Sequence, residues 1–115
     1  MKKFLVLYCM PAKGMKEWMK LPEEERKSAQ DTMKADWDLW MNNHKDMVLE
    51  TSGAGKNQRV TKEGVGGVAN DVMLFSTVQA ESEEQVSTLF KQHPHLDIPG
   101  AYIEIMPANY LPGME

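Results

Sequence analysis

The sequence predicts an α+β domain of the split β-α-β type, with its elements in the order β-α-β-β-α-β. Two segments that are apolar on both faces, Lys3–Met10 and Asp71–Gln79, read as central strands of a sheet. Two helix signatures, one after Pro22 and one after Ser82, each precede a further strand-like segment. Strands separated in this way by two helical connections form one sheet with both helices on the same face.

Length and composition indicate one domain, 1–115, that carries no strong charge. A chain of 115 residues is the size of one ordinary domain. The net charge of −4 disfavours nucleic acid and anionic membrane surfaces as partners. No stretch approaches the ~20 apolar residues that span a bilayer. A single cysteine, Cys9, excludes an internal disulfide and points to a cytoplasmic protein.

The first strand, Lys3–Met10, must be covered on both sides. Its alternation places three residues on one face and three on the other, namely Phe4, Val6 and Tyr8 against Leu5, Leu7 and Cys9. The following connector, Pro11–Leu21, contains Gly14 and is expected to hold at most a short helical turn around Met15–Met19.

A long helix is predicted from Pro22 to about Lys45. Pro22 suits the first helical position, and three glutamates after it complement the positive end of the helix dipole. Apolar or aromatic residues recur at steps of three and four, which gives one buried face made of Ala29, Met33, Trp37, Trp40, Met41 and His44.

The middle of the chain is expected to supply the second and third strands. Met47–Thr51 reads as the second strand, and Gln58–Thr61 can continue it beyond two glycines. Lys62–Asn70, with three further glycines, reads as a hairpin connection. Asp71–Gln79 is the third strand.

The last part of the chain is predicted to hold a short helix and the final strand. Ser82 with Gln85 three residues later forms a capping box. His93–Gly100 contains two prolines and is expected to be irregular. Ala101–Pro107 is the fourth strand, and the tail Ala108–Glu115 is expected on the surface or over a partner.

These elements give a ferredoxin-like, four-stranded antiparallel sheet with helices on one face. The opposite face would be apolar and bare, because the central strands are apolar on both sides. The simplest cover is the same face of a second copy, so the sequence predicts a homodimer through the helix-free sheet face.

Several segments of this chain resemble the YCII-related (DGPF-type) family. They are "MKKFLVLYCMPAKG", "LPEEERKSAQDTMKADWDLWMNNH" and "VQAESEEQVSTLFKQHPHLDIPGAYIEIMP". The resemblance implies a dimeric α+β barrel, an acid–base site built on a His and an Asp, and activity on small, often aromatic molecules. The chain lacks the Asp-Gly-Pro-Phe motif and has no histidine between Cys9 and Asn43. A non-catalytic dimeric binding or sensing module is therefore the alternative.

The best candidates for chemistry lie in His93-Pro94-His95-Leu96-Asp97. If the chain is extended there, the side chains of His93, His95 and Asp97 project to the same side. A histidine with a carboxylate nearby is the usual acid–base pair, so His95 and Asp97 are the candidate catalytic residues. Two histidines at i and i+2 can also hold a metal when other ligands are supplied, but no cofactor or metal is predicted.

Three other residues are candidate ligand contacts: Trp18, Tyr8 and His93. Trp18 lies in the first connector, where a Trp is either a lid over a pocket or a dimer contact. We expect a small-molecule pocket between sheet and helices, roofed by Pro11–Leu21 and His93–Gly100. The two tryptophans of the long helix are more typical of core.

Overall fold

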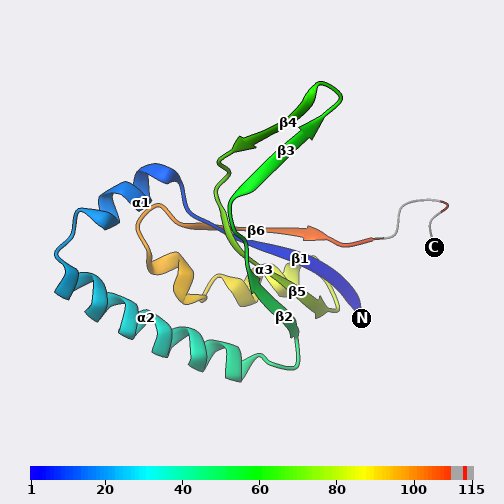
Figure 1. Cartoon of the computed structure of the whole chain (residues 1–115). Coiled ribbons are helices and arrows are strands. Elements are labelled where there is room, and N and C mark those ends of the chain that lie inside the picture. Colours follow the sequence, from blue (N-terminus) through cyan, green and yellow to red (C-terminus); the bar gives the residue numbers. More distant parts are fainter. Residues whose placement is uncertain (110–112, 114–115) are drawn as a thin grey trace.

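A four-stranded antiparallel sheet in the order β2-β5-β1-β6 forms the centre of the molecule (Figure 1). The computed structural model describes residues 1–109 and Gly113. The strands of this sheet are β1 (Lys2–Cys9), β2 (Val48–Gly53), β5 (Val72–Ala80) and β6 (Tyr102–Pro107). The predicted mixed α+β architecture with a four-stranded antiparallel sheet is confirmed.

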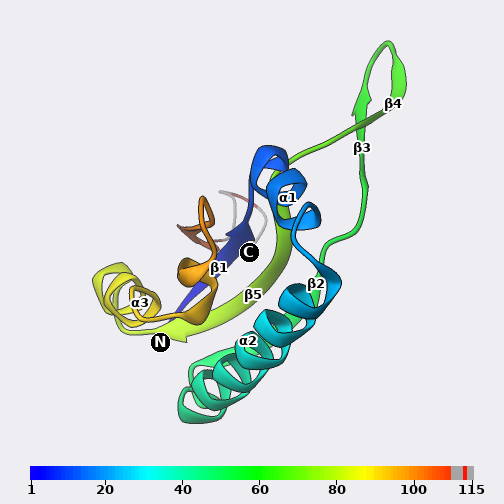
Figure 2. The same ribbon diagram turned by 90° about the vertical axis from the view of Figure 1, so that its left-hand side faces the viewer.

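Two helices pack against the same face of the sheet, α2 (Glu23–Asn43) and α3 (Glu83–Phe90), as Figure 2 shows. The inward residues of β1, Phe4, Val6 and Tyr8, are buried in one apolar cluster with Trp40 of α2 and Phe90 of α3. Of the two apolar faces predicted for β1, the helices therefore cover the one that carries Phe4, Val6 and Tyr8.

The predicted capping box of α3 is present, whereas the bounds of α2 differ slightly from those predicted. The Gln85 backbone N–H donates to the Ser82 hydroxyl at 3.1 Å, and the Gln85 amide oxygen accepts from the backbone N–H of Glu81 at 2.8 Å. Pro22 is the N-cap residue of α2 rather than its first helical residue. The helix ends at Asn43, two residues before the predicted Lys45, with His44 as its C-cap.

Only the C-terminal half of α2 is packed against the sheet. Trp40 near the end of the helix is buried, and Trp37 and Met33 are half-buried. Ala29, in the first half of the helix, is exposed. The prediction of one continuous buried face is therefore wrong for the first half of the helix within a single chain, because that half extends past the sheet (Figure 1).

The segment after β2 forms a hairpin of its own instead of continuing that strand. Strands β3 (Asn57–Thr61) and β4 (Gly64–Val68) pair only with each other and project away from α2 and α3 (Figures 1 and 2). Reading Gln58–Thr61 as a continuation of β2 was wrong, and so was reading all of Lys62–Asn70 as a connection. We call residues 57–68 the β3–β4 arm.

Two connectors are more regular than predicted. Helix α1 (Ala12–Met19) occupies most of the first connector, and a 3-10 helix, η1 (Pro94–Asp97), lies in the segment expected to be irregular. Pro94 suits the first position of a helical turn because its fixed φ matches it, and the His95 backbone N–H donates to the His93 ring at 3.0 Å.

Within the described residues, no helix combines the length and the hydropathy needed to cross a membrane. Of the tail expected at Ala108–Glu115, residues 110–112, 114 and 115 lie outside the part of the chain that the structure describes.

Candidate functional site

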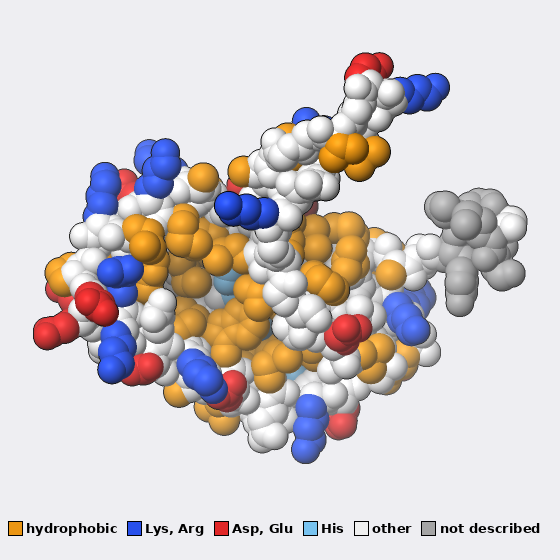
Figure 3. Space-filling view, in the orientation of Figure 1, with side chains coloured by type: hydrophobic (Ala, Val, Ile, Leu, Met, Phe, Trp, Pro, Cys, Tyr) orange, Lys and Arg blue, Asp and Glu red, His pale blue; other side chains and the backbone are white. Residues whose placement is uncertain are grey.

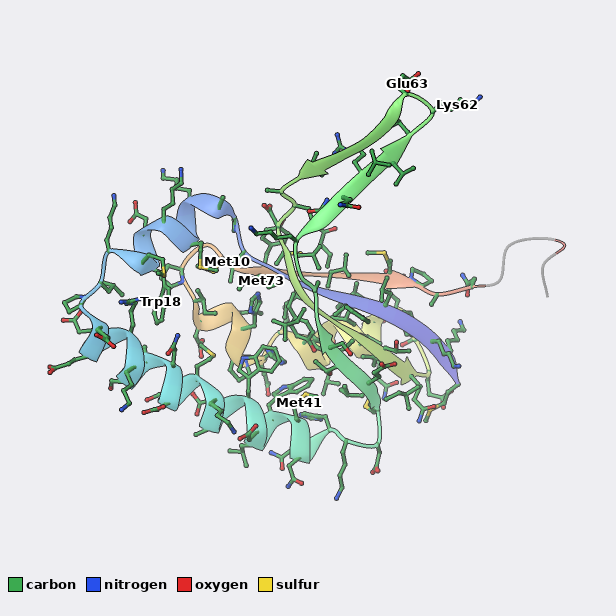
Figure 4. The ribbon with its side chains drawn as sticks, viewed as in Figure 1. Met10, Trp18, Met41, Lys62, Glu63 and Met73 are labelled. Atoms are coloured by element: carbon green, nitrogen blue, oxygen red, sulfur yellow. The ribbon has the colours of Figure 1, made fainter. Side chains whose placement is uncertain are left out.

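A hollow opens between α1, α2 and the sheet. Figure 3 shows apolar side chains around it and a histidine side chain at its base. Met10, Trp18 and Met73 lie around its rim, and Met41 lies below it on α2 (Figure 4). Trp18, Met41 and Met73 are half-buried, so part of each side chain remains free to contact a ligand. An apolar concave wall of this kind is typical of small-molecule sites.

Helix α1 and the segment after η1 meet beside this hollow. A Cβ atom added at Gly14 of α1 would lie 3.3 Å from the Met10 Cε atom and 3.5 Å from the backbone oxygen of Pro99. Glycine at this position lets α1 approach both groups closely. The two connectors expected to roof a pocket are thus brought into contact.

Tyr8 lies in the buried interior below these elements. Its ring is fully buried, and its hydroxyl is 2.8 Å from the Ser76 hydroxyl, which lies 2.6 Å from the Thr51 hydroxyl. Burial raises the pKa of Tyr8 to about 12, and the hydrogen bonds with Ser76 and Thr51 oppose that rise. Tyr8 is therefore a neutral phenol at neutral pH.

His93 is enclosed by aromatic rings. Its ring centroid lies 4.3 Å from that of Trp37, 4.4 Å from that of Trp40 and 5.1 Å from that of Tyr8. Burial, with smaller effects from the nearby His95 and His44, lowers the pKa of His93 from 6.5 to about 3. Since its Nδ1 atom accepts the hydrogen bond from the His95 backbone, the proton of the neutral ring is on Nε2.

Two buried N–H groups of this aromatic cluster have no hydrogen-bond partner in the described part of the chain: His93 Nε2 and Trp40 Nε1. The Trp37 and His93 rings are nearly perpendicular, at 86°. Ring edges that meet ring faces can make weak N–H···π contacts, which offset part of the cost of burying such donors.

His95 is fixed by the backbone of two strands. Its Nε2 atom lies 2.9 Å from the carbonyl oxygen of Cys9 in β1, and the backbone of Tyr102 at the start of β6 also bonds to the ring. Burial lowers the pKa of His95, and these two hydrogen bonds oppose the effect. The imidazole is buried and connects η1 to the sheet.

Asp97 does not share the surroundings of the two histidines. It is exposed, and it lines a groove of about 440 Å³ together with α2 residues that include Glu25 and Asp36. The expectation that His93, His95 and Asp97 project to one side depended on an extended chain. The 3-10 helix η1 removes that geometry, because successive side chains turn around its axis.

The predicted ligand contacts Tyr8 and His93 and the predicted catalytic residue His95 thus lie close together. The third predicted contact, Trp18, lies on the nearby helix α1 rather than in a loop. Ser76, Thr51 and the Cys9 carbonyl were not predicted. Ser76 could have been found, because it is a polar residue at an inward position of β5, between Leu74 and Val78. A lone buried hydroxyl at such a position indicates a partner.

Metal binding receives no geometric support from the side chains that the structure describes. No three His, Cys, Asp or Glu residues among them lie close enough together to hold a metal ion.

Comparison with known proteins identifies the fold but no family. No protein-family model matches this chain, and no curated protein matches it. Nine protein chains of solved structures match it. One is 5-chloro-2-hydroxyhydroquinone dehydrochlorinase (TftG) from Burkholderia phenoliruptrix AC1100, solved as a complex with 2,5-dihydroxybenzoquinone.

The likeness to TftG extends over the whole chain at low identity. It has a TM-score of 0.56 and 11% identity, and covers 98% of this chain and 99% of TftG. At that identity it shows a shared α+β fold and nothing about the reaction.

Proposed function

We propose that this chain binds a small, neutral aromatic molecule in the hollow between α1, α2 and the sheet. The observation that carries the proposal is the apolar wall formed by the half-buried Trp18 and Met73 and the buried Met10, beside a buried cluster of aromatic and imidazole rings. Tyr8, His93 and His95 are neutral at neutral pH, so this cluster offers no full charge to an ionised ligand. Aromatic rings prefer edge and offset contacts with a planar ligand.

The shared fold supports a small ring compound as the ligand. TftG, which has the same fold, was solved with a hydroxylated quinone, a planar six-membered ring with oxygen substituents. We further propose that this chain is a YCII-related protein with a ferredoxin-like sheet, as the sequence resemblance implies. Acid–base chemistry at His95 with Asp97 is the catalytic form of the proposal, and binding without catalysis is the alternative.

The position of the two candidate catalytic residues favours binding over that dyad. The His95 ring is hydrogen-bonded to the Cys9 carbonyl, and the Asp97 carboxylate faces a different groove. A conformational change would have to bring the two together before they could exchange a proton through a ligand.

Replacing Trp18 with alanine is expected to weaken ligand binding by about tenfold, which corresponds to about 1.4 kcal/mol. Calorimetric titration with hydroquinone and with catechol, two aromatic compounds that are uncharged at neutral pH, measures this directly. Met19→Ala is the matched control, because Met19 is the next residue of α1 and is 58% exposed. No binding of either compound to the wild type, or equal losses in the two variants, would contradict the proposed site.

The catalytic form of the proposal is separated from binding alone by two conservative variants. Asp97→Asn and His95→Gln should abolish turnover of a compound that still binds if the two residues act as acid and base. If Asp97→Asn has no effect on any activity found, the dyad is wrong and the binding site stands.

We also propose that the chain forms a homodimer through the helix-free face of the sheet. Leu5 and Leu7 alternate with the buried Phe4, Val6 and Tyr8, and each remains half-buried in the single chain. Leu7 pairs with Phe75 of β5, and Leu5 pairs with Met106 of β6, so apolar residues lie side by side on this face. Covering such a face with a second copy removes it from water.

Light scattering at micromolar concentration is expected to give about twice the chain mass of 13.1 kDa. Leu5→Glu should convert the dimer into a folded monomer, because it places a charge in the apolar interface. Leu39→Glu, on the exposed side of α2, is the control and should remain a dimer. A folded wild-type monomer at these concentrations would refute the proposed homodimer.

A further inference from the structure

The β3–β4 arm is not covered by its own chain. Every residue of β3 and β4 is exposed except Asn57 and Val68, the ends nearest the sheet. Val60 and Val65 face each other in the register, and their side chains are 74% and 64% exposed. An isolated two-stranded hairpin is marginally stable in water, so an extended arm of this kind is expected to pack against another surface.

Gly67 of β4 leaves room for a close approach from outside the chain. Gly64 adopts a positive φ of 145°, which explains a glycine at the turn, but Gly66 and Gly67 do not have positive φ. A Cβ atom added at either position would meet nothing within 4 Å. Glycine in a strand interior weakens it and often marks the close approach of another backbone. No part of the described chain makes that approach at Gly66 or Gly67.

The two faces of the arm differ in character. Because residues paired across a hairpin share a face and alternate along each strand, Gln58, Val60, Val65 and Gly67 lie on one face. Arg59 and Gly66 lie on the other. The first face is therefore the apolar one. At the base of the arm, residues of both faces, among them Gly67 and Val68, line a groove of about 790 Å³.

The charged residues of the arm lie away from its apolar face. Lys56, Arg59 and Lys62 give the arm and its root three cations and Glu63 one acid, whereas the whole chain has a net charge of −4. Lys62 and Glu63 are at the tip, far from the body of the molecule (Figure 4). Arg59 lies on the face opposite to Val60 and Val65, and Lys62 and Glu63 lie at the tip, so the Val60/Val65 face itself carries no charge.

We propose that the β3–β4 arm of one copy packs its Val60/Val65 face against a second copy of this chain. The arm projects away from α2 and α3, so a copy seated on the helix-free face lies on the side toward which the arm extends. The interaction rests on the proposed homodimer and enlarges its interface. It covers the exposed Val60/Val65 pair with an apolar surface, and the missing side chain of Gly67 lets the second copy approach the backbone closely.

A pair of matched variants tests the contact. Gly67→Leu adds bulk to the contacting face and is expected to raise the dimer dissociation constant at least tenfold. Gly66→Leu adds the same bulk to the opposite face and is expected to change that constant less than twofold. Sedimentation of both variants across a concentration series measures the difference. Equal effects of the two substitutions, or none, would overturn the proposed contact.

Hydrogen exchange gives a second readout that does not depend on a variant. Backbone amides of residues 57–68 are expected to exchange slowly where the wild type is dimeric, and faster on dilution to the monomer. Arm amides that exchange at one rate in a dimer and in a monomer would refute the contact while leaving the homodimer intact. A wild type that is monomeric throughout would refute both, and the titrations with hydroquinone would be unaffected.

Discussion

Replacing Trp40 with alanine is expected to lower the free energy of unfolding by about 3–5 kcal/mol, as truncation of a large core side chain does. Trp40 is the buried residue of α2, and its ring packs against Phe90 at 4.9 Å, His44 at 4.5 Å and His93 at 4.4 Å between centroids. Removing it leaves a void where the sheet, α2 and α3 meet. Urea unfolding followed by circular dichroism measures the loss.

The control for this substitution is Leu39→Ala, one residue earlier on the same helix. Leu39 is 62% exposed, so its truncation should change stability by less than about 0.5 kcal/mol. Similar urea midpoints for the two variants would mean that α2 presents a different face to the sheet.

The central sheet and both packed helices could be predicted from the sequence because their signals are local and strong. Alternation groups the side chains of β1 into two apolar faces, and the Ser82 capping box marks the start of α3. The β3–β4 arm could not be predicted in the same way. Gly64, Gly66 and Gly67 read as a connection, because strand propensity is low in glycine and only pairing with Asn57–Thr61 makes the segment a strand.

The candidate site was predictable only in part, because the conformation of a five-residue segment decides it. His93 and His95 were expected to project to the same side of the segment, and both are buried beside Tyr8. The direction of Asp97 depended on whether the chain stayed extended, and a hydrogen bond from the His95 backbone to the His93 ring favours the 3-10 turn instead. That interaction leaves no pattern in the sequence beyond the spacing of the two histidines.

The buried histidines should make the stability of this protein fall as the pH is lowered through the range where free histidine titrates. Burial lowers the pKa of His93 from 6.5 to about 3 and also lowers that of His95. Between about pH 3 and pH 6.5, His93 binds a proton in the unfolded chain but not in the folded chain, so protonation favours unfolding. The expected slope reaches about 1.4 kcal/mol per pH unit for each such group, and stability is recovered as the pH rises above 6.5.

Urea unfolding at a series of pH values from 7.5 to 5 measures this slope, and a substitution of His93 assigns it. His93→Asn keeps an acceptor for the His95 backbone N–H but cannot titrate, so the decline with falling pH should be less steep than in the wild type. Leu96→Asn introduces the same amide into the same turn at an exposed position and should keep the wild-type slope. If His93→Asn loses stability equally at every pH, the His93 ring does not lie neutral and buried among Trp37, Trp40 and Tyr8.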